Sequence, residues 1–263
     1  MSLENIDHFI VLMLENRSFD HIFGPRNGVE GLAGDVPNKF ANNGPDGAIK
    51  PQGGAPFSIP TKHGKGPFHN LLDVNEQLFG TKSPAAGQQA EMTGFVSSYV
   101  EALKQDTRGA FDADDIKVVM QSFDPGALPA MTAVADNFVL CDHWFREVPG
   151  PTHPNRLYMH AGTSSGFVHN VFKRPFDILT IYELLQRNGQ SWATYDSNLN
   201  EVKMFTRISD ATDNFKRFTP SFREMLRPAA CQIIHSSFRA SPPPTMLKLM
   251  TCTPLMMFGG ATN

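Results

Sequence analysis

Cysteine, long apolar runs and basic leader sequences are scarce or missing in this chain of 263 residues. The three cysteines are an odd number, and Cys141 lies far from the other two. A full disulfide framework is therefore excluded, and buried or free thiols are expected. The longest early apolar run, residues 9–14, is far shorter than the roughly 20 residues that a membrane helix needs. No basic segment precedes it, so we expect no signal peptide, no transmembrane segment and a cytoplasmic location for the chain as written.

Charged residues make up only 19% of the chain, and the formal net charge is -3 with a pI near 6.3. A broad basic field of the kind that non-specific nucleic-acid binding requires is absent, so nucleic acid is excluded as a default partner. With 41% hydrophobic residues, the chain can bury a sizeable core in one large domain or two small ones.

Acidic residues stop altogether after Glu224. The segment 229–263 holds two of the three cysteines and a run of three prolines, and it shows no helical or strand period. It is either a plain apolar tail packed on the sheet or foreign sequence from a shifted reading frame. We favour the second interpretation, because a segment without period, caps or charge does not look selected for folding. The chain is thus divided into a domain of residues 1–228 and an atypical tail.

Apolar periodicity predicts alternating strands and helices. The continuous run 9–14 is typical of a parallel strand covered on both faces, and residues 26–66, rich in Gly, Pro and Asn, indicate a long surface excursion. Helices are predicted at residues 71–79, 92–103, 114–123, 128–135, 154–161 and 180–187, and further strands at 138–140 and 192–195. This alternation favours an α/β sandwich around a mostly parallel sheet.

Two polar side chains, Glu15 and Asn16, stand where the first predicted strand ends. Ligand sites of open α/β sheets gather at the carboxyl ends of strands, and a carboxylate with an amide oxygen suits a hard divalent cation. The same pair could instead cap the N-terminus of a following helix.

The sequence GPTHPNR at residues 150–156 places Thr152 between a forced turn and a helix with Pro154 in its first turn. A hydroxyl there faces unpaired N–H groups and the positive end of the helix dipole, which suits a nucleophile that attacks a phosphate. A simple helix cap is the alternative role of Thr152.

Two long motifs in this order resemble one known family. ENRSFDHIFG at residues 15–24, and GPTHPNR followed by LYMHAGTSSG at residues 157–166, are similar to the phosphoesterase family. That family comprises phosphatidylcholine-hydrolysing phospholipases C, plant non-specific phospholipases C and acid phosphatases. The resemblance covers roughly residues 4–225, including DVNEQL at 73–78 and MTGFV at 92–96.

The resemblance implies an α/β sandwich similar to alkaline phosphatase, in which a metal and a hydroxyl nucleophile act on a tetrahedral phosphate. Glu15 and Asn16 match the metal ligands, for a divalent ion of unknown identity. Thr152 matches the nucleophile, which would form a phosphothreonine intermediate. His69 matches a histidine that contacts the phosphate or the leaving group. Pro67-Phe68 precede it where the family has Pro-Gly, so a solvated loop histidine is the alternative.

Asn155 and Arg156 lie one helical turn from Thr152, so either could donate a hydrogen bond to a phosphate oxygen. Arg156 could instead pair with an acid inside the fold. The implied activity is hydrolysis of a phosphodiester such as a glycerophospholipid, with transient contact to a membrane surface. An acid phosphomonoesterase and a non-catalytic, phosphate-binding remnant are the alternatives. Relatives of this kind are often exported.

One part of the family pattern is missing. A late Asp-Glu pair and a run similar to Gly-Gly-Phe-Tyr-Asp-His supply the remaining metal ligands in the family, and neither occurs here. A cation held by one carboxylate and one amide would be loosely bound, so we expect an incomplete metal site and a truncated sheet.

We predict that the 263-residue chain alone shows little phosphodiester turnover, and that an in-frame family C-terminal segment grafted after Pro228 restores it. Phosphoryl transfer needs a tightly placed metal, and misplacement by about 1 Å lowers the rate on the order of 100-fold. Turnover by the purified chain and by the graft is measured side by side. A rate of roughly 1 per second or more for the chain alone contradicts the prediction.

Overall fold

The computed structural model describes residues 9–13, 17–32, 41–56, 66–170, 175–196, 201–217 and 250–251. The chain divides into two compact units, each with its own core. The first unit comprises Met1–Leu12, Arg156–Phe167 and Val171–Met250. The second unit comprises Met13–Asn155, Val168–Asn170 and Thr251–Asn263.

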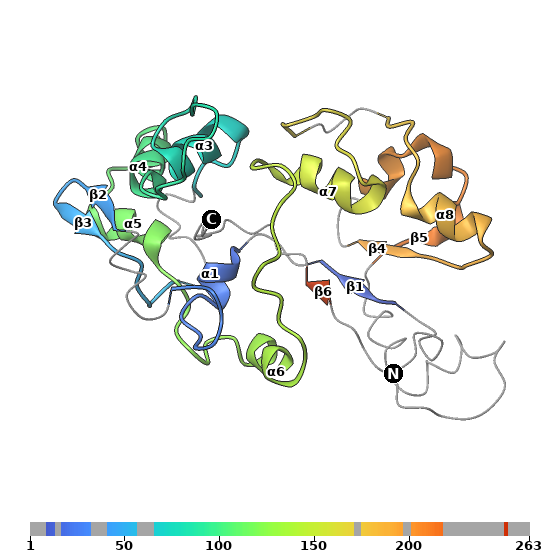
Figure 1. Cartoon of the computed structure of the whole chain (residues 1–263), viewed down its shortest axis with the longest axis horizontal. Helices are drawn as coiled ribbons and strands as arrows, with labels where there is room; N and C mark the ends of the chain where they lie inside the picture. Colours follow the sequence, from blue (N-terminus) through green and yellow to red (C-terminus); the bar gives the residue numbers. More distant parts are fainter. Residues whose placement is uncertain are drawn as a thin grey trace. The chain divides into compact units, whose positions relative to one another are not determined.

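The second unit is mainly helical in its described part, with one small hairpin (Figure 1). Its helices are α1 Phe19–Ile22, α3 Leu71–Phe79, α4 Phe95–Lys104, α5 Ala113–Lys117, the 3-10 turn η2 Val118–Met120 and α6 Pro129–Asn137. The strands β2 Asn42–Gly44 and β3 Gly47–Ile49 pair antiparallel.

Helix α4 is the centre of the core in this unit. Its buried apolar side chains recur at the spacing of one helical face: Phe95, Val96, Tyr99, Ala102 and Leu103. This face packs against buried side chains of the segments on either side, Met92, Ile116 and Met120. The amphipathic period that predicts this helix is therefore also what builds the core.

The buried side chain of Asn42 caps helix α4 from the hairpin. Its Oδ1 accepts from the backbone N–H groups of Phe95 and Val96 at 2.7 and 3.2 Å, and its Nδ2 donates to the carbonyl of Met92 at 3.0 Å. Helix α4 has no side-chain cap from its own Gly94. A Cβ at Gly94 would lie 1.9 Å from the Glu76 carbonyl oxygen, so α3 and α4 approach too closely for a larger residue.

The first unit contains the helix α8 Ile181–Arg187 and the parallel strands β4 Thr194–Asp196 and β5 Phe215–Arg217 (Figure 1). Short 3-10 turns lie between the strands: η3 Glu201–Met204, η4 Thr206–Ile208 and η5 Thr212–Asn214. The core comprises Leu157, Phe176, Val202, Phe205 and Ile208. Helix α7, Thr152–Ala161, passes from the second unit into the first.

All six predicted helices are present. Five agree with the prediction to within three residues at each end, and the predicted helix 114–123 is a short α-helix followed by the turn η2. Local signals explain this accuracy. Asn70 and Asp73 form a capping box at the start of α3, Gly80 ends it with a φ of 68°, and Pro129 is the first residue of α6.

The strands differ more from the prediction. In the described part of the chain the strands form three two-stranded sheets, β1-β6, β2-β3 and β4-β5, where β1 is Val11–Leu12 and β6 is Met250–Thr251. The predicted strand 192–195 overlaps β4, which pairs in parallel as expected. The mixture of helices and strands is consistent with an α/β protein, but the described sheets are small.

Two buried strands were expected at places where the structure exposes the side chains. Phe9 is 71% exposed and Val11 is 54% exposed, so the run 9–14 is not covered on both faces in its described part. The prediction of a strand at 138–140 is wrong, because this segment is irregular and Val139 is 86% exposed. A strand needs a hydrogen-bonded neighbour, and no described segment pairs with residues 138–140.

Cys141 is a free and exposed thiol, and the other two cysteines lie outside the described residues. No helix in the described ranges is both long enough and apolar enough to cross a membrane.

Candidate active site

Helix α7 begins at Thr152, which is half-buried and lies at the end of the turn 150–152. Pro154 occupies the third position of the helix, where an N–H group would have no acceptor within the helix. The hydroxyl group of Thr152 is thus placed at the positive end of a helix of 10 residues. This is the position that the sequence predicts for the nucleophile.

The side-chain amide of Asn155 holds the turn 150–152 in place. Its Oδ1 accepts from the N–H of Val148 at 3.1 Å. Its Nδ2 donates to the carbonyls of Val148 and Pro151 at 3.0 and 2.9 Å, with the Gly150 carbonyl at 3.5 Å. The amide hydrogens of Asn155 therefore point at backbone carbonyls, so the observed contacts position the turn. Donation to a phosphate oxygen stays a prediction.

Gly150 lies where three segments meet. A Cβ on it would be 3.4 Å from the carbonyl oxygen of Val168 and 3.8 Å from the backbone nitrogen of Leu71. The guanidinium of Arg146 donates from Nη1 to the Gly150 carbonyl at 2.5 Å. The turn is therefore hydrogen-bonded by the loop before it, and residue 168 and the start of α3 lie close to Gly150.

His69 lies two residues before Leu71, whose backbone nitrogen is close to Gly150. Its side chain is exposed, and Nδ1 is 3.4 Å from the carbonyl of Pro67. The start of α3, two residues after His69, thus lies close to Gly150. Its contact with a phosphate or leaving group stays a prediction.

Arg156 forms its ion pair within the first unit. Its Nη1 forms an ion pair with Oε2 of Glu201 at 2.7 Å, and the side chains are 27% and 15% exposed. This is the second role considered for Arg156, pairing with an acid inside the fold. A half-buried pair of this kind anchors the middle of α7.

The two histidines of α7 are buried. The backbone N–H of His153 donates to Oδ1 of Asn170 at 3.0 Å, which satisfies one of the free donors at the helix start. Nδ1 of His160 lies 2.8 Å from the hydroxyl of Tyr182. Burial, and then the charge of Arg156, lowers the pKa of His160 to about 4, and burial raises the pKa of Tyr182 to about 12. Both side chains are thus neutral at neutral pH.

The N-terminal motif is described only in part, because Glu15 and Asn16 lie outside the described residues. Further along the motif, Ser18 Oγ accepts from the N–H of His21 at 3.1 Å and caps the short helix α1. Burial, with a contribution from Arg17, lowers the pKa of His21 to about 4. These residues of the motif build the local structure next to the two predicted ligands.

Within the described ranges, no group of three or more His, Cys, Asp or Glu side chains is placed to hold a metal ion. The predicted ligands Glu15 and Asn16 supply one carboxylate and one amide oxygen. That donor set fits a hard divalent cation such as Mg²⁺ or Ca²⁺ and does not suit a thiophilic metal.

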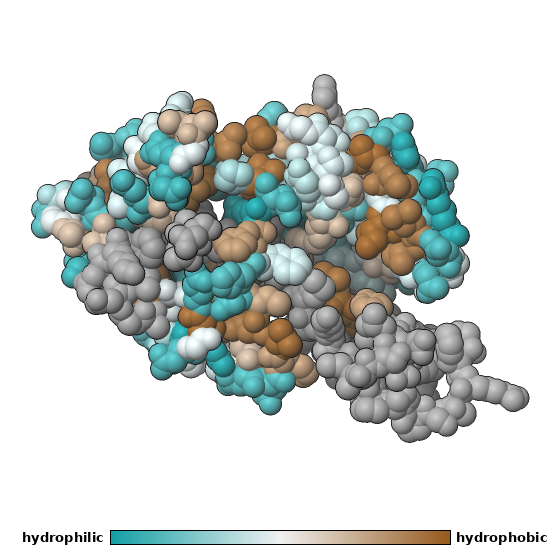
Figure 2. Space-filling model, viewed as in Figure 1, coloured by the Kyte–Doolittle hydropathy of each residue, from teal (hydrophilic) through white to brown (hydrophobic). Residues whose placement is uncertain are grey.

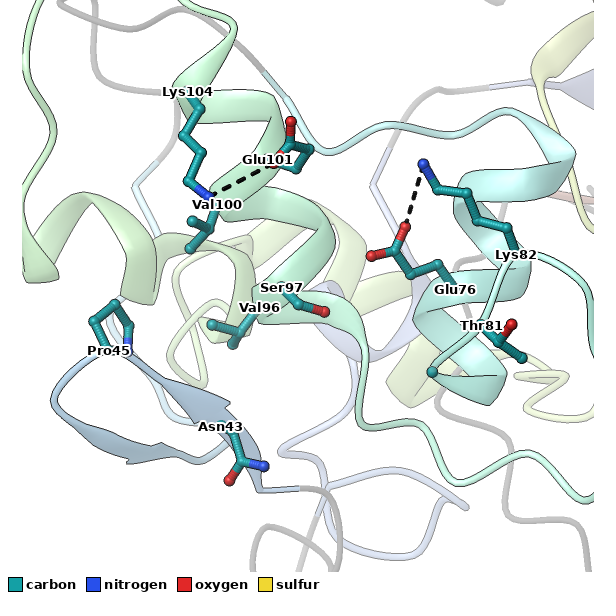
Figure 3. A pocket seen from close by; sticks show the side chains of 11 residues that line it. Asn43, Pro45, Glu76, Thr81, Lys82, Val96, Ser97, Val100, Glu101 and Lys104 are labelled. Carbon is teal, nitrogen blue, oxygen red and sulfur yellow. Dashed lines mark ion pairs between the residues drawn. The ribbon is translucent and has the colours of Figure 1, made fainter.

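A hollow of about 640 Å³ lies between the hairpin, α3 and α4 (Figure 3). Its charged residues form two ion pairs, Lys82 with Glu76 and Lys104 with Glu101, each at 3.7 Å. No residue of the turn 150–152 or of α7 lines it. Because its charges are paired with each other, the hollow offers no net positive charge to a phosphate.

The two motifs and the geometry around Thr152 agree with the comparison to known proteins. The model of the phosphoesterase family matches residues 6–240. The chain belongs to the phosphoesterase family. The resemblance read from the motifs is confirmed, and the match includes all six predicted site residues: Glu15, Asn16, His69, Thr152, Asn155 and Arg156.

Similar phosphoesterases include plant and bacterial proteins. Non-specific phospholipase C3 of Arabidopsis thaliana is 31% identical over 237 residues, which are 84% of this chain and 43% of that protein. Non-specific phospholipase C1 of the same plant is 32% identical over 77% of this chain and 37% of its own. The hemolytic phospholipase C of Pseudomonas aeruginosa is 31% identical over 62% of this chain and 20% of its own. The chain spans less than half the length of these relatives.

Sequence reasoning missed several residues that support the phosphoesterase motif. Arg146, Asn170, Tyr182 and Glu201 contact the turn or α7 from other parts of the chain. Only Arg146 could have been found from the sequence, because it lies four residues before Gly150, the first residue of the second motif. The other three contacts depend on how distant segments fold together.

We predict that Asn155→Ala lowers the free energy of unfolding by about 1–3 kcal/mol, because it leaves backbone groups of the turn without their partners. Asn155→Asp keeps the acceptor for the Val148 N–H but places a carboxylate oxygen against the carbonyls of Val148 and Pro151, so its loss should be at least as large as that of alanine. Urea unfolding measures both. Asn188→Ala is the matched control, since that amide donates to one carbonyl at an exposed helix end. An equal loss of unfolding free energy at both positions would show that Asn155 does not hold the turn in place.

We also predict that stability falls in mild acid. The folded pKa of His160 is about 4 against an ordinary 6.5, so between these values the unfolded chain binds a proton that the folded chain does not. The free energy of unfolding therefore decreases as the pH drops from 6.5 to 4, by on the order of 3 kcal/mol for His160. His21 acts in the same range. Urea unfolding at several pH values is the measurement. If the free energy of unfolding depends on pH as steeply in the His160→Gln His21→Gln variant as in the parent, the prediction is refuted.

Proposed function

We propose that the chain carries the nucleophile half of a phospholipase C-type phosphodiesterase, with a glycerophospholipid as substrate. The observation that carries this proposal is the hydroxyl of Thr152 at the start of α7, on a turn fixed by Asn155 and Arg146. Membership of the phosphoesterase family supports a hydrolase that acts on ester bonds. The relatives named phospholipase C support the diester substrate.

In the first step the Oγ of Thr152 attacks phosphorus and its proton passes to solvent water, while the bond between phosphorus and the diacylglycerol oxygen breaks and that oxygen takes up a proton. His69 is the group that would supply it, since its segment lies beside the turn. The first N–H groups of α7 and the helix dipole favour the phosphate charge. A metal held by Glu15 and Asn16, when bound, neutralises phosphate oxygens and favours the deprotonated hydroxyl.

In the second step a water molecule attacks phosphorus of the phosphothreonine. The bond to Thr152 breaks, the hydroxyl regains its proton, and the phosphorylated headgroup leaves. Asn155 takes no part in bond making and serves as a positioning residue. Arg156, paired with Glu201, is a structural residue of its part of α7.

We predict that Thr152→Ala abolishes phosphodiester hydrolysis in the graft described above, and that Thr152→Ser retains it, because serine keeps the hydroxyl at the same helix position. Hydrolysis of a phosphocholine diester is measured against a chromogenic phosphomonoester. Acid quenching during turnover of the diester should trap the phosphorylated headgroup on the parental chain and not on the alanine variant. Parental rates in Thr152→Ala would place the nucleophile elsewhere.

The same assay separates the other functions. Preference for the monoester would make the protein a phosphomonoesterase, because the nucleophile serves both reactions. Binding of inorganic phosphate without turnover of either ester, even in the graft, would make it a phosphate-binding module.

A further inference from the structure

Four large hydrophobic side chains are exposed within residues 138–145, which we call the exposed segment. Phe138 is 53%, Val139 86%, Trp144 46% and Phe145 56% exposed. The segment has no helix or strand and begins where α6 ends. Figure 2 shows hydrophobic side chains at the surface over α6 as well. Soluble proteins rarely gather so many large apolar groups on the surface without a binding role.

The exposed segment is joined directly to the turn that carries Thr152. Phe145 precedes Arg146, and the guanidinium of Arg146 donates to the carbonyl of Gly150. Gly150 is six positions after Trp144 in the chain, so the two lie within about 20 Å of each other. Whatever surface the segment binds therefore lies within about this distance of the turn that carries Thr152.

The composition of the segment fits a lipid–water interface better than a protein core. Tryptophan is enriched at membrane interfaces because its ring has an apolar body and a polar N–H. The backbone of the segment is irregular, so its polar groups need water and cannot enter the hydrocarbon interior. The side chains can therefore insert to headgroup depth and no further.

The charges around the segment are not net positive. Asp142 and Glu147 are acidic, Arg146 is basic, and His143 pairs with Glu30 at 2.6 Å. The whole chain has a net charge of -3. Attraction to an anionic membrane is thus not expected, and binding would depend on buried apolar area.

We propose that the exposed segment binds the surface of a zwitterionic phospholipid layer such as phosphatidylcholine and holds the turn 150–152 against it. This inference rests on the proposed function, since a phospholipase C-type enzyme must reach substrate that is packed in a membrane. Lipid is the proposed partner of this surface. Binding to a second copy of the chain is the alternative that the test distinguishes from it.

Tryptophan emission gives a direct test, because the chain has two tryptophans. Trp192 packs against the ring of Tyr182, with centroids 4.6 Å apart, whereas Trp144 is exposed. In Trp192→Phe, phosphatidylcholine vesicles should shift the Trp144 emission to shorter wavelength. In Trp144→Phe, the emission of the remaining Trp192 should not shift. Each variant keeps one tryptophan, so a conclusion can still be drawn from one variant if the other folds poorly.

Co-sedimentation with the same vesicles measures the strength of binding. The double change Trp144→Ala Phe145→Ala should weaken it roughly tenfold or more, as expected for losing two inserted aromatic side chains. The matched control is Ile181→Ala Leu184→Ala, which removes side chains of α8 that are 50% and 45% exposed. This control should bind like the parent, and high salt should leave binding unchanged.

Equal binding by the aromatic variant and the parent would overturn the proposal. So would binding that high salt abolishes, or a Trp144 shift that depends on protein concentration without lipid, which indicates a second copy. Thr152→Ala should bind vesicles like the parent. In the graft with the family C-terminal segment, hydrolysis without a Trp144 response removes this inference alone, whereas a Trp144 response without hydrolysis removes the proposed function alone.

Discussion

The candidate site depends on one side-chain amide. Asn155 reaches back along its own helix and binds the backbone at Val148 and Pro151, so the loop before α7 and the first turn of α7 form one rigid piece. The hydroxyl of Thr152 is carried on that piece, at the positive end of the helix. Rigidity matters here because in-line attack on phosphorus tolerates little displacement of the nucleophile. A side chain from a distant segment could not couple the turn to the helix as directly.

Helix α7 combines one reactive group with several anchors. After Thr152, its polar side chains are used for support: Asn155 holds the turn, Arg156 pairs with Glu201, and His160 contacts Tyr182. Burying a neutral histidine and a charged pair costs desolvation free energy, which the hydrogen bonds only partly offset. The polar sequence of this helix is therefore explained by its need to be fixed at several points, and not by several catalytic residues.

The sequence predicts those parts of the structure that depend on near neighbours. Capping residues and Gly80 define α3, Pro129 starts α6, and Pro154 marks the first turn of α7. The sequence could not predict contacts between distant segments, such as the cap of α4 by Asn42 or the pairing of Arg156 with Glu201. The predicted strand at 138–140 failed for the same reason, because apolar residues form a strand only where a neighbouring strand accepts their hydrogen bonds.

That failure and the proposed lipid surface have one physical cause. An apolar run such as residues 138–140 is stabilised either by another strand or by another apolar phase, and the described part of the chain supplies no strand for it. Val139, Trp144 and Phe145 are left in contact with water, at a free-energy cost proportional to their exposed apolar area. Because the neighbouring charges are not net positive, the surface that removes this cost should be selected by its apolar area and not by attraction to anionic lipid. A layer of zwitterionic lipid has this property, and the fixed turn that carries Thr152 follows the exposed segment by a few residues.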